Sequence, residues 1–327
     1  MVIFFRNKSI LAVFFLVALC LLVHLHLFVT PAQVVINADD GFLSVLLLKY
    51  VKPLPETALF LLYNALVILQ AIRLNLVLNE FKMFQQSAFT TAMAYILLSA
   101  CLPQWCAITP ALVANSFLVW IFIKLSKLYN NPSPKTLLFN TGLIVGITIM
   151  SYHPTALLVL VVLFTLAVVR PFRLAEWLIL LIGILTPYYF LLSGMFLTGR
   201  MSSLPGFTPK LQINLPVRYM DLWLWINSGV LLLSLIIGFI QWFPAKNRMV
   251  IQVRKNWGAM VVMLLILLPV PFIFKKAGLE SIFLITVPLA AFISNAYLNP
   301  KRLWLPNLLF WLTIAIIIHN NWVLIKF

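Results

Sequence analysis

Residues 9–30 read SILAVFFLVALCLLVHLHLFVT, a run with no lysine, arginine, aspartate or glutamate. At about 1.5 Å of rise per residue, a helix of this length crosses the roughly 30 Å of hydrocarbon in a bilayer. The run is too long for the core of a signal peptide and lacks a clear small-x-small cleavage site, so we expect a retained first span. Similar runs recur to the end of the chain and predict an all-α, polytopic membrane protein.

The composition supports this class. Hydrophobic residues make up 63% of the chain and charged residues 9%, far from the balance of a soluble domain. The net charge of +16 does not indicate nucleic acid, because the basic residues lie almost entirely between apolar runs. No polar segment is long enough to bury a core of its own. We therefore expect one integral membrane domain over residues 1–327, with membrane lipids around it and no nucleic-acid partner.

Eleven spans fit the pattern of apolar runs best. The run over 137–170 would make a helix of about 50 Å, too long for one crossing, and Ser151-Tyr152-His153-Pro154 interrupts it. The predicted spans are 9–30, 57–78, 87–102, 109–128, 137–151, 154–170, 174–197, 221–243, 257–274, 279–298 and 303–324. A short amphipathic segment, residues 42–51, lies between the first two spans.

Basic residues set the expected orientation. With the N-terminus in the cytoplasm, fifteen of the 23 lysines and arginines lie in inner segments and eight in outer ones. Five of the seven acidic residues then lie outside, namely Asp39, Asp40, Glu56, Asp221 and Glu280. This pattern predicts a multi-pass protein of the bacterial inner membrane with a cytoplasmic N-terminus.

The stretch VINADDGF, residues 35–42, holds two adjacent carboxylates directly after the first span. Carboxylates are costly in or near hydrocarbon, so Asp39 and Asp40 are candidate catalytic residues. One alternative is that either residue caps a short helix that begins near Gly41.

All four histidines are expected on the same outer side as this pair. His153 is the strongest candidate, because Pro154 breaks the helix there and histidine serves as an acid, base or ligand near neutral pH. His24, His26 and His319 fit packing or interface roles. Cys101 and Cys106 flank an outer loop in which a disulfide is one alternative.

Basic residues on the outer side run against the positive-inside rule. Arg200, Lys210 and Arg218 share the longest outer loop, and Lys275 occupies another. They are candidate binding residues for an anionic substrate, and contact with lipid headgroups is the alternative.

The chain has no Walker A loop, dinucleotide fingerprint, GxSxG elbow or HExxH helix. No predicted span carries an acidic residue in mid-membrane, which disfavours an ion-coupled transporter.

Several segments resemble an uncharacterised family of polytopic inner-membrane proteins from Bacteroidota. They include residues 110–118, Lys127-Leu-Tyr-Asn-Asn, Gly142 to Pro154, and Arg170-Pro-Phe-Arg-Leu-Ala-Glu-Trp with Thr186-Pro-Tyr. The resemblance covers most of the chain and implies a membrane location and topology, with no activity attached.

The order of features is also similar to the GT-C glycosyltransferases: an N-inside first span, an acidic pair in the first outer loop, a short amphipathic segment, then many spans. This resemblance implies sugar transfer from a polyprenyl-phosphate donor at the outer face. Asp39 and Asp40 would act as a base or bind a divalent cation, and the four outer basic residues would hold the donor phosphate. The chain is shorter than most such enzymes and shows no soluble C-terminal domain.

Three functions follow in order of preference. The first is a GT-C-like glycosyltransferase that uses a lipid-linked sugar donor, with Asp39, Asp40 and His153 as catalytic residues. The second is a non-catalytic subunit or scaffold of a cell-envelope complex, which would have protein partners in the envelope. The third is a small-molecule transporter.

Overall fold

The computed structural model describes residues 1–7, 9–36, 40–199, 201, 222–274, 278–298 and 304–323. In this part of the chain the regular structure is helical, apart from a single parallel β-bridge between Val34 and Ile108. The α-helices are α1 (Ile3–Arg6), α2 (Ile10–Val23), α3 (Phe42–Leu46), α4 (Glu56–Glu80), α5 (Thr90–Ser99), α6 (Pro110–Ser126), α7 (Lys135–Ser151), α8 (Leu158–Val169), α9 (Leu174–Leu197), α10 (Leu222–Lys246), α11 (Ile251–Leu267), α12 (Val270–Ile273), α13 (Thr286–Leu298) and α14 (Trp304–Ile318). Short 3₁₀ or π turns are η1 (Leu25–Phe28), η2 (Leu47–Val51), η3 (Pro103–Trp105), η4 (His153–Leu157), η7 (Leu279–Ile285) and η8 (His319–Val323).

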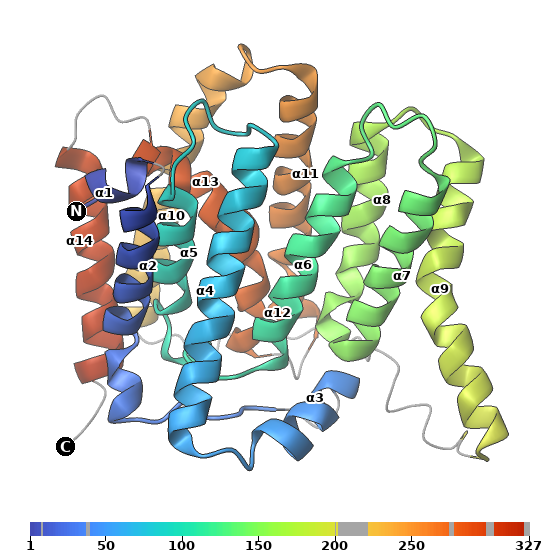
Figure 1. Cartoon of the computed structure of the whole chain (residues 1–327), viewed down its shortest axis with the longest axis horizontal. Coiled ribbons are helices and arrows are strands. Elements are labelled where there is room, and N and C mark those ends of the chain that lie inside the picture. Colours follow the sequence, from blue (N-terminus) through green and yellow to red (C-terminus); the bar gives the residue numbers. More distant parts are fainter. Residues whose placement is uncertain are drawn as a thin grey trace.

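Most of the longer helices run roughly side by side, while α3 lies across one end of the bundle (Figure 1). We call this the α3 end; it holds η1, the last turn of α7, η4, η7 and η8. Phe42, Val45 and Leu48 are exposed along α3 and η2, whereas Ser44 and Leu47 are buried. An exposed apolar stripe with this spacing suits a helix that rests in the membrane interface.

Within the described residues, five helical segments are long and apolar enough to cross a membrane: Glu56–Glu80, Leu174–Leu197, Trp223–Lys246, Ile251–Ile273 and Leu279–Leu298. Six shorter apolar helical segments accompany them, among them α2, α5 and α6. The all-α class and the membrane character agree with the sequence. Every predicted span contains a helix, but helix length and composition support five crossings and not the predicted eleven.

The break predicted within residues 137–170 is confirmed. Helix α7 ends at Ser151, η4 turns the chain, and α8 begins at Leu158. Helices α7 and α9 then pack at very short range through glycines. A Cβ atom on Gly142 would overlap the carbonyl oxygen of Leu180, and one on Gly183 would overlap that of Phe139. The GxxxG spacing of Gly142 and Gly146 therefore serves helix packing.

Three asparagine amides hold the end of α5 inside the bundle. Asn320 and Asn227 both donate to the carbonyl of Cys101, at 2.8 and 2.9 Å, and Asn321 donates to that of Ala100 at 2.8 Å. These bonds satisfy carbonyls that a helix end leaves without an intrahelical partner. The disulfide that was one alternative for Cys101 and Cys106 is not formed, and both residues are free, buried thiols.

Candidate functional site

Asp40 lies at the α3 end, against the last turn of α7. Its side chain is almost completely buried, with the residue 4% exposed, and its carbonyl oxygen accepts a hydrogen bond from the backbone N–H of His153 at 2.9 Å. Gly41 allows the backbone at Asp40 to lie this close to the end of α7. It has a φ of +113°, and a Cβ atom there would lie 2.7 Å from the carbonyl oxygen of Met150. Only glycine adopts this conformation in this space without strain.

Gly41 is the N-cap residue of α3, and it has no side chain with which to cap the helix. The two interpretations of the acidic pair, catalytic residues or helix caps, both stay predictions. Asp39 lies outside the described residues, as do Arg200, Lys210, Arg218 and Lys275.

Asp40 belongs to a cluster with Tyr152 and Glu280, which we call the acidic cluster. Burial, followed by the negative charges of Asp40 and Glu280, raises the pKa of Tyr152 well above its ordinary value. Tyr152 therefore stays protonated at neutral pH and remains a hydrogen-bond donor beside two carboxyl groups. The charges of Asp40 and Glu280 also interact with each other. The cluster combines a candidate base with a candidate proton donor.

Glu280 is held in place from the neighbouring loop. The indole N–H of Trp105 in η3 donates to the carbonyl oxygen of Leu279 at 3.1 Å. The ring of Trp105 also meets that of Phe283 edge-on, with centroids 5.7 Å apart. These contacts fix the start of η7, which carries Glu280.

A pocket of about 410 Å³ opens beside the acidic cluster and shares Glu280 with it. The crossing loop, residues 31–36, forms one wall and is tied to the α5–α6 loop by the Val35 N–H to Ile108 carbonyl bond of 3.2 Å. The pocket is lined by His26, Leu27, Thr30, Pro31, Gln33, Val35, Pro103, Gln104, Cys106, Ala107, Glu280, Asn320 and Asn321.

The four histidines lie at the α3 end but do not share a site. His153 is buried beside Asp40, and His26 lines the pocket. The Nδ1 of His24 lies 2.9 Å from the Cys20 carbonyl oxygen, and its ring meets that of Tyr63 edge-on. His319 stacks on Trp223 with centroids 3.5 Å apart. The packing role predicted for His24 and His319 fits these contacts.

Sequence reasoning missed Glu280, Tyr152 and the role of His26. Glu280 is one of the few acidic residues on the outer side, and Tyr152 lies in the break before Pro154. The scarcity of acidic residues and the break before Pro154 can both be read from the sequence, but nothing in the sequence shows that residue 280 lies near residue 40. Within the described residues, no three His, Cys, Asp or Glu side chains are grouped to hold a metal ion. The described residues alone do not form the divalent-cation site that the GT-C resemblance implied.

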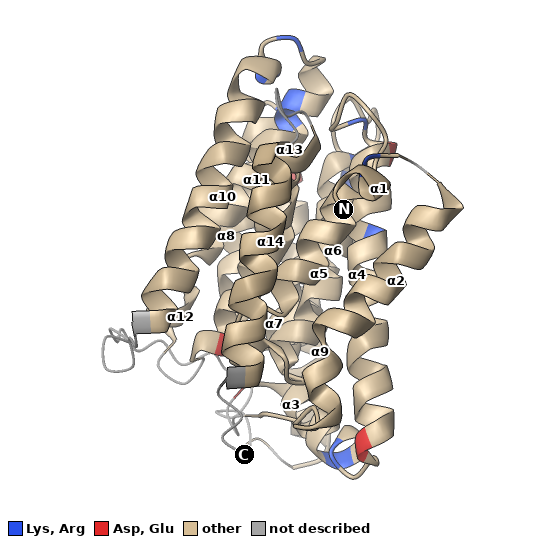
Figure 2. Cartoon of the chain, turned by 90° about the vertical axis from the view of Figure 1, so that its left-hand side faces the viewer, with Lys and Arg blue, Asp and Glu red and all other residues tan. Residues whose placement is uncertain are grey.

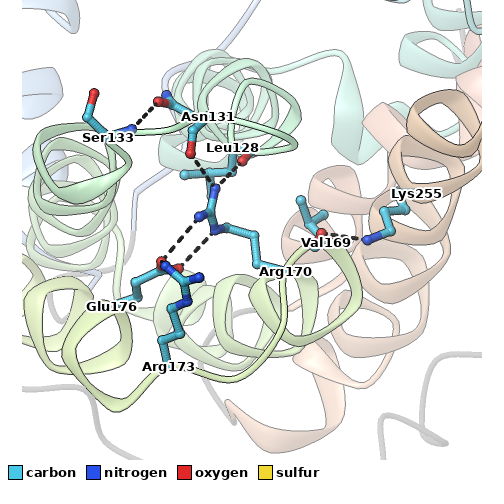
Figure 3. Close-up of polar contacts among 8 residues, drawn as sticks. All are labelled: Leu128, Asn131, Ser133, Val169, Arg170, Arg173, Glu176 and Lys255. Carbon is cyan, nitrogen blue, oxygen red and sulfur yellow. Dashed lines mark hydrogen bonds and ion pairs between the residues drawn. The ribbon is translucent and has the colours of Figure 1, made fainter.

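The opposite end holds a second charged cluster, which is structural. Arg170 forms a two-bond ion pair with Glu176, at 2.9 and 3.2 Å, and donates to the carbonyls of Leu128 and Asn131 at 2.8 and 2.9 Å (Figure 3). Nearby, Lys255 donates to the carbonyl of Val169 at 2.7 Å. The Arg170 and Lys255 side chains link the loops between α6, α7, α8 and α9. Their hydrogen bonds are made to groups of the protein itself.

Comparison with known families gives one finding. Residues 41–326 match the model of DUF6427, a family of unknown function. The chain belongs to this family. No curated protein and no solved structure matches the chain significantly. The family match agrees with the predicted resemblance to an uncharacterised family, and it attaches no activity to the site.

Proposed function

We propose that this chain is a polytopic membrane enzyme that transfers a sugar from a polyprenyl-phosphate donor at the α3 end, in the manner of the GT-C glycosyltransferases. The observation that carries the proposal is the burial of Asp40 near Tyr152 and Glu280, next to a pocket whose lining includes several amide side chains. Burying a carboxylate costs several kcal/mol of solvation, so the buried Asp40, with the half-buried Glu280 near it, has a chemical reason to be there.

In the proposed reaction, the carboxylate of Asp40 accepts the proton of an acceptor hydroxyl. The acceptor oxygen then forms a bond to the anomeric carbon of the donor sugar. The bond from that carbon to the phosphate oxygen breaks, and polyprenyl phosphate leaves with the electron pair. Asp39 would assist as a second base or as a ligand of a divalent cation, His153 would support the proton transfer, and Arg200, Lys210, Arg218 and Lys275 would hold the phosphate.

The surroundings suit a lipid-linked donor. Helix α9 exposes Phe190 and Leu197 near its end, at 68% and 84%, and α3 presents its apolar stripe at the same end of the bundle. A polyprenyl chain would lie against such a surface while its headgroup reaches the pocket. The proposal places the α3 end outside the bacterial inner membrane and the N-terminus in the cytoplasm, with eleven crossings.

The direct test is sugar release from a labelled donor. Full-length protein in liposomes is given polyprenyl-phosphate mannose with a radiolabelled sugar, and water-soluble or acceptor-bound label is counted. Asp40→Asn keeps the shape of the side chain and removes the base, so the rate is expected to fall by about 10²–10⁴-fold. Glu56→Gln is the matched control, because Glu56 is an exposed carboxylate at the same end. A folded Asp40→Asn protein with the wild-type rate would reject the mechanism.

A second function, a non-catalytic subunit of an envelope complex, is favoured by α9. This helix packs mainly on α7 and leaves Ile182, Leu185 and Phe190 exposed along its length. An edge helix of this kind suits a neighbouring membrane subunit as well as lipid. A fixed partner that co-purifies with the chain, together with no sugar release by the purified pair, would favour this function over the enzyme.

A further inference from the structure

We propose that the 410 Å³ pocket binds the hydroxyl groups of a neutral sugar, the acceptor of the transfer, and does not bind the phosphate of the donor. The assignment of the sugar as an acceptor rests on the proposed function. The assignment of the pocket to a neutral sugar rests on the lining residues alone. The volume lies within the range of about 300–1,000 Å³ that is typical of ligand pockets.

The lining residues supply the groups that bind hydroxyls. Gln33, Gln104, Asn320 and Asn321 contribute amides, and Thr30 contributes a hydroxyl. Each sugar hydroxyl both donates and accepts a hydrogen bond, so it pairs with amides and carboxylates alike.

The described lining residues give a phosphate no lysine or arginine to bind. Glu280 is the one lysine, arginine, aspartate or glutamate among the described lining residues, and the charge of Asp40 lies close behind it. Phosphate oxygens require positive charge or several N–H donors. A phosphate here would instead face the carboxyl groups of Glu280 and Asp40, which offer it no positive charge.

His26 adds an independent reason to expect a ligand. The residue is 3% exposed and lines the pocket, and its ring lies near the Val23 backbone, with no hydrogen bond of good geometry to Nδ1 within the described part of the chain. A buried polar atom without a full hydrogen bond destabilises the protein. A ligand that brings hydroxyls to this wall would lower the cost.

The pocket is also held in shape before any ligand arrives. Asn320 and Asn321 use their amide N–H groups on the carbonyls of Cys101 and Ala100. The crossing loop pairs with Ile108 through two backbone bonds, of 3.2 and 2.9 Å. A preformed wall loses little conformational freedom on binding, which favours a small, weakly bound ligand such as a monosaccharide.

Saturation-transfer NMR on the full chain in lipid nanodiscs tests the proposal. The neutral probes are methyl α-glucopyranoside and N-acetylglucosamine, and the anionic probes are glucuronate and glucose 6-phosphate. The neutral sugars are expected to bind at least about ten-fold more tightly, because the anionic ones meet Glu280. Glu280→Gln should remove this preference, whereas Glu56→Gln should keep it. Gln104→Ala, at an exposed position, should weaken the neutral sugars without affecting the fold.

Anionic probes that bind as tightly as neutral ones would overturn the proposal. So would a preference that survives Glu280→Gln in a folded protein. The proposed function can fail while the pocket assignment holds. Neutral sugars would then bind with a preference that depends on Glu280, but the protein would release no sugar from the donor. Donor turnover without any preference for neutral sugars would reject the pocket assignment alone.

Discussion

At the scale of single residues, Gly41 matters as much as the carboxylate before it. Its positive φ and the short distance to the α7 backbone bring Asp40 under the last turn of that helix. The scarcity of acidic residues made Asp40 a candidate in the sequence. Glu280 was not predicted as its neighbour, because the two residues meet through packing between segments far apart in the chain. Tyr152 joins them for the same reason.

Gly41→Ala tests this arrangement. The added methyl group has to avoid two backbone carbonyls, and alanine is strained at this φ, so the free energy of unfolding should fall by about 1–3 kcal/mol. Asp40 should also move away from Glu280 and sugar release should fall. Thermal unfolding in detergent and the donor assay measure the two effects.

Gly199→Ala is the control for that change. Gly199 also has a positive φ, +65°, but a Cβ atom there meets no atom of the described residues within 4 Å. The Gly199→Ala variant should have the same backbone strain of alanine at a positive φ but should leave Asp40 in place. Its sugar release should equal that of the wild type. Equal activity in Gly41→Ala would show that the close approach to α7 is not needed.

At the scale of helices, apolar runs predicted where the elements lie but only partly how they pair. The break at Ser151 was readable because a single helix would have been too long and Pro154 interrupts it. The close pairing of α7 with α9 depends on Gly183 opposite Gly142, a register that the sequence of either helix alone does not reveal. Among the described residues, five helical segments are long and apolar enough to cross a membrane, because several predicted spans hold helices that are shorter than their apolar runs.

Two substitutions within α9 separate packing from helix propensity. Gly183→Ala should lower the free energy of unfolding by about 1–3 kcal/mol, because its methyl group overlaps the α7 backbone. Gly194→Ala meets nothing within 4 Å and should be neutral or stabilise the helix by about 1 kcal/mol. Thermal unfolding of both variants gives the comparison. Equal effects would contradict the close α7–α9 contact.

At the scale of the molecule, charge distinguishes the two ends. Lysines and arginines gather at the end opposite α3, with a smaller mixed group of charges near α3 (Figure 2). The sequence predicted that basic residues would gather at one end, because the lysines and arginines that set membrane topology lie in short loops. It did not predict the pocket, whose wall combines the crossing loop, the α5–α6 loop, η7 and η8.

The orientation is tested by labelling single introduced cysteines. Lys52→Cys lies near α3 and Lys127→Cys at the opposite end, and both positions are exposed. The three native cysteines are buried and should not react. A membrane-impermeant maleimide should label residue 52 in intact spheroplasts and residue 127 only after lysis. The reverse pattern would place the α3 end in the cytoplasm, where the proposed reaction has no place.

The most direct measurement is a structure of the full chain in nanodiscs with a non-transferable polyprenyl-phosphate sugar analogue. We expect density for the sugar at the α3 end, beside the acidic cluster, with a hydroxyl or ring atom within about 3 Å of the Asp40 or Glu280 carboxyl oxygens. The polyprenyl chain should lie on the outer apolar surface of the bundle. A headgroup bound at the Arg170 end, or a saturated sample with no headgroup near Asp40, would contradict the account.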